Sequence, residues 1–259
     1  MIDVQSQPDY RDIPLHKVGI KDLKYPIKVL DREKKFQDTV AIVNMFVDLP
    51  KNFRGTHMSR FVEVLEKHKH TMGIHVMEDI LEEIRRVFDA KTAHLELRFP
   101  YFIKKKAPIS GFESYMDYEC ALIGSKDDRR IDLVVEVNVP VLNVCPCSKE
   151  ISEYGAHNQR GIVKIQVRMK KFVWFEELIE IAERSASAPL YALLKREDEK
   201  YITERSYRNP KFVEDVVRDV ALELKKDKRL KWFLVEALNF ESIHNHNAYA
   251  CVASQHLGG

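Results

Sequence analysis

Three long stretches in the middle of the chain read as β-strands, and they constrain its fold more than any other feature. They cover residues 93–103, 113–123 and 131–144, and each has the length and the β-branched and aromatic content of a strand in a sheet. Shorter stretches of the same character cover residues 36–47, 161–172, 232–240 and 248–254. A chain with this many strands must build its core around a sheet.

Helical periodicity occurs in two blocks between these strands. In the first block, apolar residues from Met58 to Leu65 recur at helical spacing behind Thr56, a plausible N-cap, and a second helix follows Gly73. The second block, residues 175–225, holds two or three helices, and the clearest has Asn209 as its cap and Pro210 at its first helical position. The first 30 residues contain three prolines and read as an irregular arm.

The order of elements is strands, two helices and strands, and then the same again. This order predicts an α+β fold, in which two similar halves of antiparallel sheet are backed by helices. We expect residues 1–259 to form a single domain, with halves of roughly 15–127 and 128–259.

Composition excludes several classes of protein. The formal net charge is +2, so the balance of charge gives no reason to expect a nucleic-acid partner. The longest apolar run, near residues 134–144, is broken by polar residues, so we expect no membrane-spanning segment. The N-terminus has neither a basic start nor an apolar signal core, and a cytoplasmic location is the default expectation.

Two polar clusters carry residues suited to chemistry. The first reads CPCSKEISEYGAHNQRG at positions 145–161 and holds Cys145 and His157, and the second reads NFESIHNH at positions 239–246. Thiolate, imidazole and carboxylate groups together suit a divalent metal such as zinc, iron or manganese. The Cys-Pro-Cys spacing is a poor fit to a structural zinc site, so one thiol with His157 and remote carboxylates would leave an open coordination position for catalysis.

Each remaining polar residue also has a plain structural interpretation. His244 and His246, two positions apart, point to the same side of an extended chain and can simply be solvated. Glu199 lies in a charged run typical of a solvated helix face, and Glu214 near a helix start can complement the helix dipole. Residue types and spacing leave both interpretations open.

Four motifs resemble those of the type IB GTP cyclohydrolases. They are the segment from Cys145 to Arg160, GTHMSRF at 55–61, NPKFVED at 209–215 and NFESIH at 239–244. The resemblance runs from about Ile13 to the C-terminus. It implies the tunnelling fold, a homotetramer with active sites at subunit interfaces, and a hydrolase acting on cyclic amidines that converts GTP and water to 7,8-dihydroneopterin triphosphate and formate.

The resemblance also implies roles for individual residues. Cys145, His157 and Glu199 match the metal ligands, and Glu241 and His244 match further groups at the metal, where they are ligands or move protons. Cys145, His157, Glu241 and His244 therefore form the expected catalytic set, around a divalent metal that is manganese, zinc or iron(II). Glu214 matches the acid that anchors the guanine edge, and His57, Arg60 and Lys149 are candidates for binding the triphosphate.

Three alternatives stay open at this point. A related tunnelling-fold enzyme reduces a deazaguanine nitrile through a covalent cysteine, although the Glu241 and His244 cluster favours the metal interpretation. An archaeal-type cyclohydrolase that forms a cyclic phosphate is similar in sequence. A non-catalytic binding protein stabilised by zinc is the alternative outside the enzymes.

Overall fold

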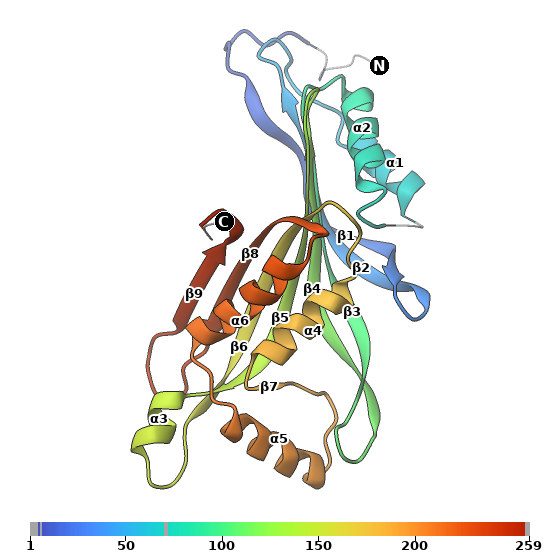
Figure 1. Ribbon diagram of the computed structural model, residues 1–259. Coiled ribbons are helices and arrows are strands. Elements are labelled where there is room, and N and C mark those ends of the chain that lie inside the picture. The colour runs from blue at the N-terminus through green and yellow to red at the C-terminus, as the bar shows by residue number, and fades with distance from the viewer. Residues whose placement is uncertain (1–4, 6, 70–71, 257–259) are drawn as a thin grey trace. The chain divides into compact units, whose positions relative to one another are not determined.

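A computed structural model describes residues 5, 7–69 and 72–256. Its elements, labelled in Figure 1, are β1 (Leu15–Asp31), β2 (Lys35–Leu49), α1 (Ser59–His68), α2 (Met77–Phe88), β3 (Ala93–Lys106), β4 (Glu113–Lys126), β5 (Ile131–Val144), α3 (Pro146–Ile151), β6 (Asn158–Met169), α4 (Phe175–Ser185), β7 (Ala188–Pro189), α5 (Arg196–Arg208), α6 (Val213–Lys226), β8 (Leu230–Asn239), β9 (Ala248–Ala253) and the 3-10 turn Ser254–His256. The strand order is β1-β2-β3-β4-β5-β6-β8-β9, with β7 paired to β5. The predicted α+β class with an antiparallel sheet backed by helices is confirmed.

The chain divides into two compact units. The first consists of Met1–Pro100 and Ala121–Val135, and the second of Tyr101–Cys120 and Glu136–Gly259. The halves expected from the sequence, with their boundary near residue 127, stay a prediction.

In the first unit, the expected N-terminal arm is wrong from Leu15 onwards. These residues form β1, which pairs antiparallel with β2 from Leu15 opposite Leu49 to Asp31 opposite Lys35. Two register shifts interrupt β1, and at the second Asp22 takes a left-handed φ of 58° while its N–H donates to Asn44 Oδ1 at 2.8 Å. These bulges break the two-residue alternation by which a strand is recognised in sequence.

The helices α1 and α2 pack against each other in the first unit. The rings of Phe61 and Phe88 stack with centroids 4.1 Å apart, and His68 Nε2 lies 2.7 Å from Glu83 Oε2. The expected cap at Thr56 is wrong, because the residue before the first turn of α1 is Met58, which makes no side-chain cap bond.

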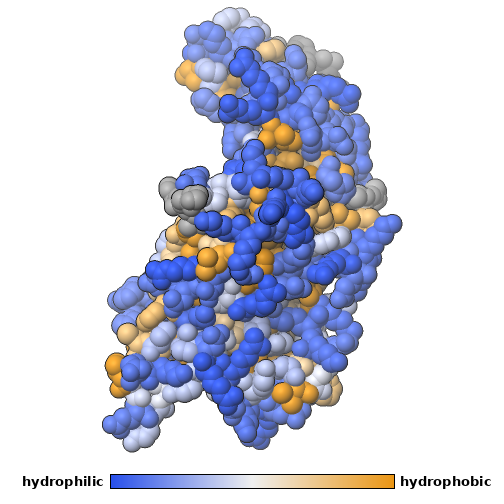
Figure 2. All heavy atoms as spheres, viewed as in Figure 1, coloured by the Kyte–Doolittle hydropathy of each residue, from blue (hydrophilic) through white to orange (hydrophobic). Residues whose placement is uncertain are grey.

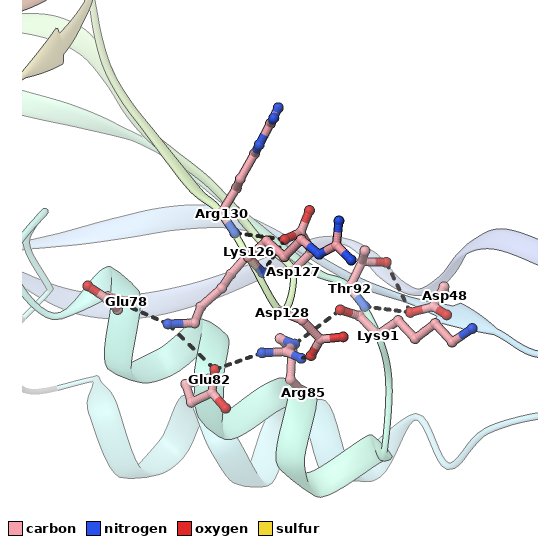
Figure 3. Close-up of polar contacts among 11 residues, drawn as sticks. Asp48, Glu78, Glu82, Arg85, Lys91, Thr92, Lys126, Asp127, Asp128 and Arg130 are labelled. Atoms are coloured by element: carbon pink, nitrogen blue, oxygen red, sulfur yellow. Dashed lines mark hydrogen bonds and ion pairs between the residues drawn. The ribbon is translucent and has the colours of Figure 1, made fainter.

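Ion pairs join α2 to the turn between β4 and β5 (Figure 3). Lys126 Nζ lies 2.7 Å from Glu78 Oε1, and Arg85 pairs with Asp128 as well as with Glu82. The turn itself is held by Asp127, whose Oδ1 accepts the N–H groups of residues 129 and 130 at 2.7 Å. The side chains of Asp127 and Asp128 thus close this turn and tie it to the helix.

In the second unit, β6, β8 and β9 pair antiparallel, and α6 packs on β8 and β9 and against α4. Every second residue of β6 from Val163 to Val167 is fully buried, as is Val235 of β8. Burying each such side chain contributes about 1.5–3 kcal/mol. This apolar layer fixes the register of β6 against β8. That register positions the ends of these strands and the loops that follow them.

Two local predictions in the second unit are wrong. The segment after Val144, expected to be a loop, contains the short helix α3. Asn209 does not cap the following helix but ends α5, and α6 begins at Val213. The reason is that Lys211 N–H donates to Val144 O at 3.0 Å, which keeps residues 210–212 extended beside the end of β5.

The surface fits a protein of mixed charge. The face seen in Figure 2 is mostly hydrophilic, with hydrophobic residues in several separate groups. Among the described residues, no helix combines the length and apolar character needed to cross a membrane.

Candidate functional site

The loop that starts at Cys145 is closed by hydrogen bonds at its two ends. Cys145 N–H donates to His157 O at 3.1 Å. Ser148 Oγ accepts from His157 N at 3.1 Å and lies 3.3 Å from Cys145 O, to which it donates. The thiol and the imidazole are therefore carried by adjacent backbone, although eleven residues of loop and α3 lie between them.

The thiol of Cys145 caps α3. Its Sγ accepts the N–H of Ser148 at 3.4 Å, and Pro146, which has no N–H to satisfy, occupies the first helical position. This bond and the proline together fix the start of α3 at the thiol.

The second polar cluster meets this loop through side-chain contacts at His157 and Gln159. His157 Nδ1 lies 3.0 Å from Gln159 Oε1 and 3.3 Å from Ser242 Oγ, and Gln159 Nε2 donates to Glu241 Oε1 at 3.3 Å. The turn between β8 and β9 thus lies against the segment joining α3 to β6. Of the predicted site residues, Cys145 is joined to His157 through the backbone, and His157 is linked to Glu241 through Gln159.

A buried amide pair holds the two strand ends from which these residues project. Asn143 is fully buried, and its Nδ2 donates to Asn239 Oδ1 at 2.8 Å while its Oδ1 accepts Ser187 N–H at 3.2 Å. A Cβ at Gly161 would lie 2.4 Å from Asn239 Oδ1, so only glycine leaves room for this amide. Asn209 Nδ2 donates to Ala186 O at 3.0 Å and joins the end of α5 to the same network.

Glu199 lies in the first turn of α5, with its side chain exposed. The neighbouring Asp198 is buried and accepts the N–H groups of Ile109 and Ser110 and the Ser110 hydroxyl. Burial alone would raise the pKa of Asp198, but these hydrogen bonds outweigh it and hold the pKa well below its usual range. Asp198 thereby fixes the start of α5 and the position of Glu199.

The other predicted residues of the second unit have separate surroundings. The imidazoles of His244 and His246 stack with centroids 5.0 Å apart, in an exposed turn rather than a strand. Lys149 Nζ donates to Tyr207 O at 2.7 Å and lies 4.5 Å from the centre of the Tyr207 ring.

Glu214 lines a groove of about 530 Å³ between α6 and the outermost strand β9. The other residues that line it are mostly apolar, and two are cationic: Val217, Arg218, Ala221, Leu222, Lys225, Ala250, Cys251 and Val252. A groove of this size, mostly apolar and with one carboxylate in its lining, has the character of a small-molecule site.

His57 and Arg60 belong to the first unit and flank the start of α1. Arg60 N–H donates to His57 O at 3.2 Å, and the Arg60 guanidinium lies 3.5 Å from Val87 O. Their predicted role in binding a triphosphate stays a prediction.

The donor atoms near Cys145 partly fit a divalent cation. Because Nδ1 of His157 faces Gln159, Nε2 is left with no hydrogen-bond partner among the described residues, as a metal-binding imidazole requires. Across residues 5, 7–69 and 72–256, however, no three His, Cys, Asp or Glu side chains form a group that could hold a metal ion. The thiol and imidazole thus supply two ligands, and the remaining ligands stay a prediction.

Sequence reasoning assigned no role to Gln159, Ser242 or the amide pair. The signal for Gln159 was present, because a residue two positions after His157 points to the same side of an extended chain. Asn143 and Asn239 stand 96 positions apart, and nothing in their local sequence pairs them.

Two solved structures share the fold at very low identity. The chain superposes on uricase from Arthrobacter globiformis with a TM-score of 0.54 and 7% identity, over 92% of each chain. It superposes on urate oxidase from Bacillus subtilis 168 with a TM-score of 0.54 and 8% identity, over 92% of this chain and 97% of that one. These likenesses confirm the predicted tunnelling fold and say nothing of the reaction.

Sequence relatives are far closer. GTP cyclohydrolase FolE2 of Kosmotoga olearia is 58% identical over 252 residues, 97% of this chain and 98% of the relative. GTP cyclohydrolase FolE2 of Thermosipho africanus is 55% identical over 254 residues, 98% of each chain. The family model described as type I GTP cyclohydrolase folE2 matches residues 1–250. The chain therefore belongs to the type I GTP cyclohydrolase FolE2 family.

Proposed function

We propose that this chain is a metal-dependent GTP cyclohydrolase of the type IB class. It converts GTP and water to 7,8-dihydroneopterin triphosphate and formate, the first step of tetrahydrofolate and pterin synthesis, in the cytoplasm. Membership of the FolE2 family supports the substrate. One observation carries the proposal. The backbone N–H of Cys145 donates to His157 O at 3.1 Å, which places the residues that bear the thiol and the imidazole side by side. Nδ1 of His157 contacts Gln159, and Nε2 is directed away from that contact.

Cys145 and His157 are the proposed ligands of manganese, zinc or iron(II). When bound, such a cation would lower the pKa of a coordinated water molecule and so would supply a nucleophile for C8 of guanine near neutral pH. Glu199, Glu241 and His244 are the proposed sources of the remaining ligands. We propose that these three residues come together with Cys145 and His157 in a homotetramer whose active sites lie at subunit interfaces.

The chain's own residues then move protons and position the substrate. N7 and N9 of the ring must be protonated as the imidazole ring opens, and Glu241 and His244 are the proposed groups that deliver these protons. Glu241 is linked to His157 through Gln159. His244 lies three residues further along the same exposed turn.

Guanine selection is assigned to Glu214. A carboxylate accepts two hydrogen bonds from the ring N–H and the exocyclic amino group of guanine, a bidentate match that adenine cannot offer. The apolar lining of the adjoining groove provides contact surface for a planar base. Lys149, His57 and Arg60 are the proposed contacts of the triphosphate.

The test is turnover of GTP by metal-stripped protein with and without added manganese, zinc or iron(II), followed as formate and as pterin fluorescence after oxidation. We expect metal-dependent turnover that Cys145→Ala and His157→Ala abolish. Cys147→Ala is the matched control, because it removes an exposed thiol two positions away and should leave turnover intact. Absence of turnover with every metal, in folded tetrameric protein, would contradict the proposal and direct the search to nitrile reduction.

A further inference from the structure

Gln159 is a buried amide in an otherwise exposed stretch. It is the second residue of β6, and 6% of it is exposed, whereas Asn158 and Arg160 on either side are exposed. Its side chain lies between His157 Nδ1 at 3.0 Å and Glu241 Oε1 at 3.3 Å. It therefore links His157 of the first polar cluster to Glu241 of the second.

The chemistry of these neighbours fixes the direction of the amide. A carboxylate oxygen accepts hydrogen bonds and donates none, so the NH₂ group of Gln159 must face Glu241. The amide oxygen then faces His157, and it can only accept. Nδ1 of His157 is consequently the protonated ring nitrogen.

The direction of the ring follows from that proton. In the Nδ1–H tautomer, the lone pair of the neutral imidazole lies on Nε2, the atom without a hydrogen-bond partner among the described residues. Ser242 Oγ also lies 3.3 Å from Nδ1, but its hydroxyl is exposed and rotates freely, so it fixes neither the tautomer nor the ring.

We infer that Gln159 is a positioning residue that sets the tautomer of His157, directs its Nε2 towards a metal ion and couples that ligand to Glu241. This inference rests on the proposed function, because it assigns Gln159 a role towards the cation held by Cys145 and His157. Metal-binding histidines are oriented in this way by an acceptor on their other ring nitrogen, and removing the acceptor weakens metal affinity about 10–100-fold.

The test is titration of the metal-stripped full-length protein with Co²⁺, read as the thiolate-to-cobalt absorption band and as affinity in competition with a chelator. Gln159→Leu removes both amide atoms at similar volume, and we expect its affinity to fall about 10–100-fold. Gln159→Glu keeps an acceptor beside Nδ1 and should bind more tightly than Gln159→Leu. Gln166→Leu is the matched control, since Gln166 lies on the same strand and donates to Glu136 at 2.5 Å without touching a histidine.

Each outcome decides between the inference and its alternatives. In one outcome, wild-type protein shows the absorption band, Cys145→Ala removes it, and Gln159→Leu binds Co²⁺ with unchanged affinity. That outcome would overturn the role of Gln159 and leave the proposed function standing. A wild-type protein without the band would overturn both. An equal loss in Gln159→Leu and Gln166→Leu, with unchanged circular dichroism, would show a general effect of removing an amide from β6 and would also overturn the inference.

Discussion

Asn143→Ala tests how much stability the buried amide pair contributes to the unit that carries the candidate site. The change leaves two buried groups without their partner, Ser187 N–H and Asn239 Oδ1, which now bond to Asn143 at 3.2 and 2.8 Å. An unsatisfied buried polar group costs about 1–3 kcal/mol, so for these two groups we expect the free energy of unfolding to fall by about 2–6 kcal/mol. Metal affinity should fall as well, because Cys145 follows two positions after Asn143.

The assay is urea unfolding at fixed protein concentration, read by tryptophan fluorescence, since both tryptophans, Trp174 and Trp232, lie in the second unit. Asn138→Ala is the control on the same strand. Its amide donates to Glu136 at 3.1 Å, and Glu136 keeps a second bond after the change, so the loss should stay below about 1 kcal/mol. Equal losses in the two variants would refute the reasoning.

Two further predictions concern packing and pH. Gly161→Ala places a Cβ 2.4 Å from Asn239 Oδ1 and should cost about 1–3 kcal/mol in the same urea assay; an unchanged midpoint would show that the strands shift at no cost. Hydrogen bonds from Lys67 and His68 lower the pKa of Glu83 from its ordinary 4.5. Between the lowered pKa and 4.5, the folded state therefore binds fewer protons than the unfolded chain. The stabilisation is therefore present above pH 4.5 and is lost as pH falls through the lowered pKa. Glu83→Gln should flatten the acid side of a plot of melting temperature against pH, and parallel curves for the two proteins would contradict it.

The sheet and most helices could be predicted because their periodicity is local. β1 could not, because its bulges and Pro26 break the alternation, and the strand is recognisable only through its pairing with β2. Asn209 and Pro210 are residue types typical of a helix start. Lys211 N–H donates to Val144 O, however, and α6 therefore begins only at Val213. That bond joins distant parts of the chain and leaves no sign in the local sequence.

The candidate site was predictable to a similar degree. The cluster at 145–161 placed Cys145 and His157 in one loop, and the resemblance joined Glu241 to them, as the structure does through Gln159. The convergence of Glu199 with these ligands stays a prediction, because Glu199 lies exposed in the first turn of α5 and nothing in the local sequence joins it to the loop at Cys145.

The distance along the chain between the parts of the site determines when it can form during folding. β1 and β2 are joined by a tight turn at Asp31 and Lys35, so their pairing closes a short loop. Gln159 and Glu241 stand 82 positions apart, and α4, α5 and α6 lie between them. Closing so long a loop is entropically costly until the intervening helices have packed, and we expect the site to assemble late. A nascent chain halted before β8 would contain the thiol and the imidazole but not the carboxylate that is linked to them.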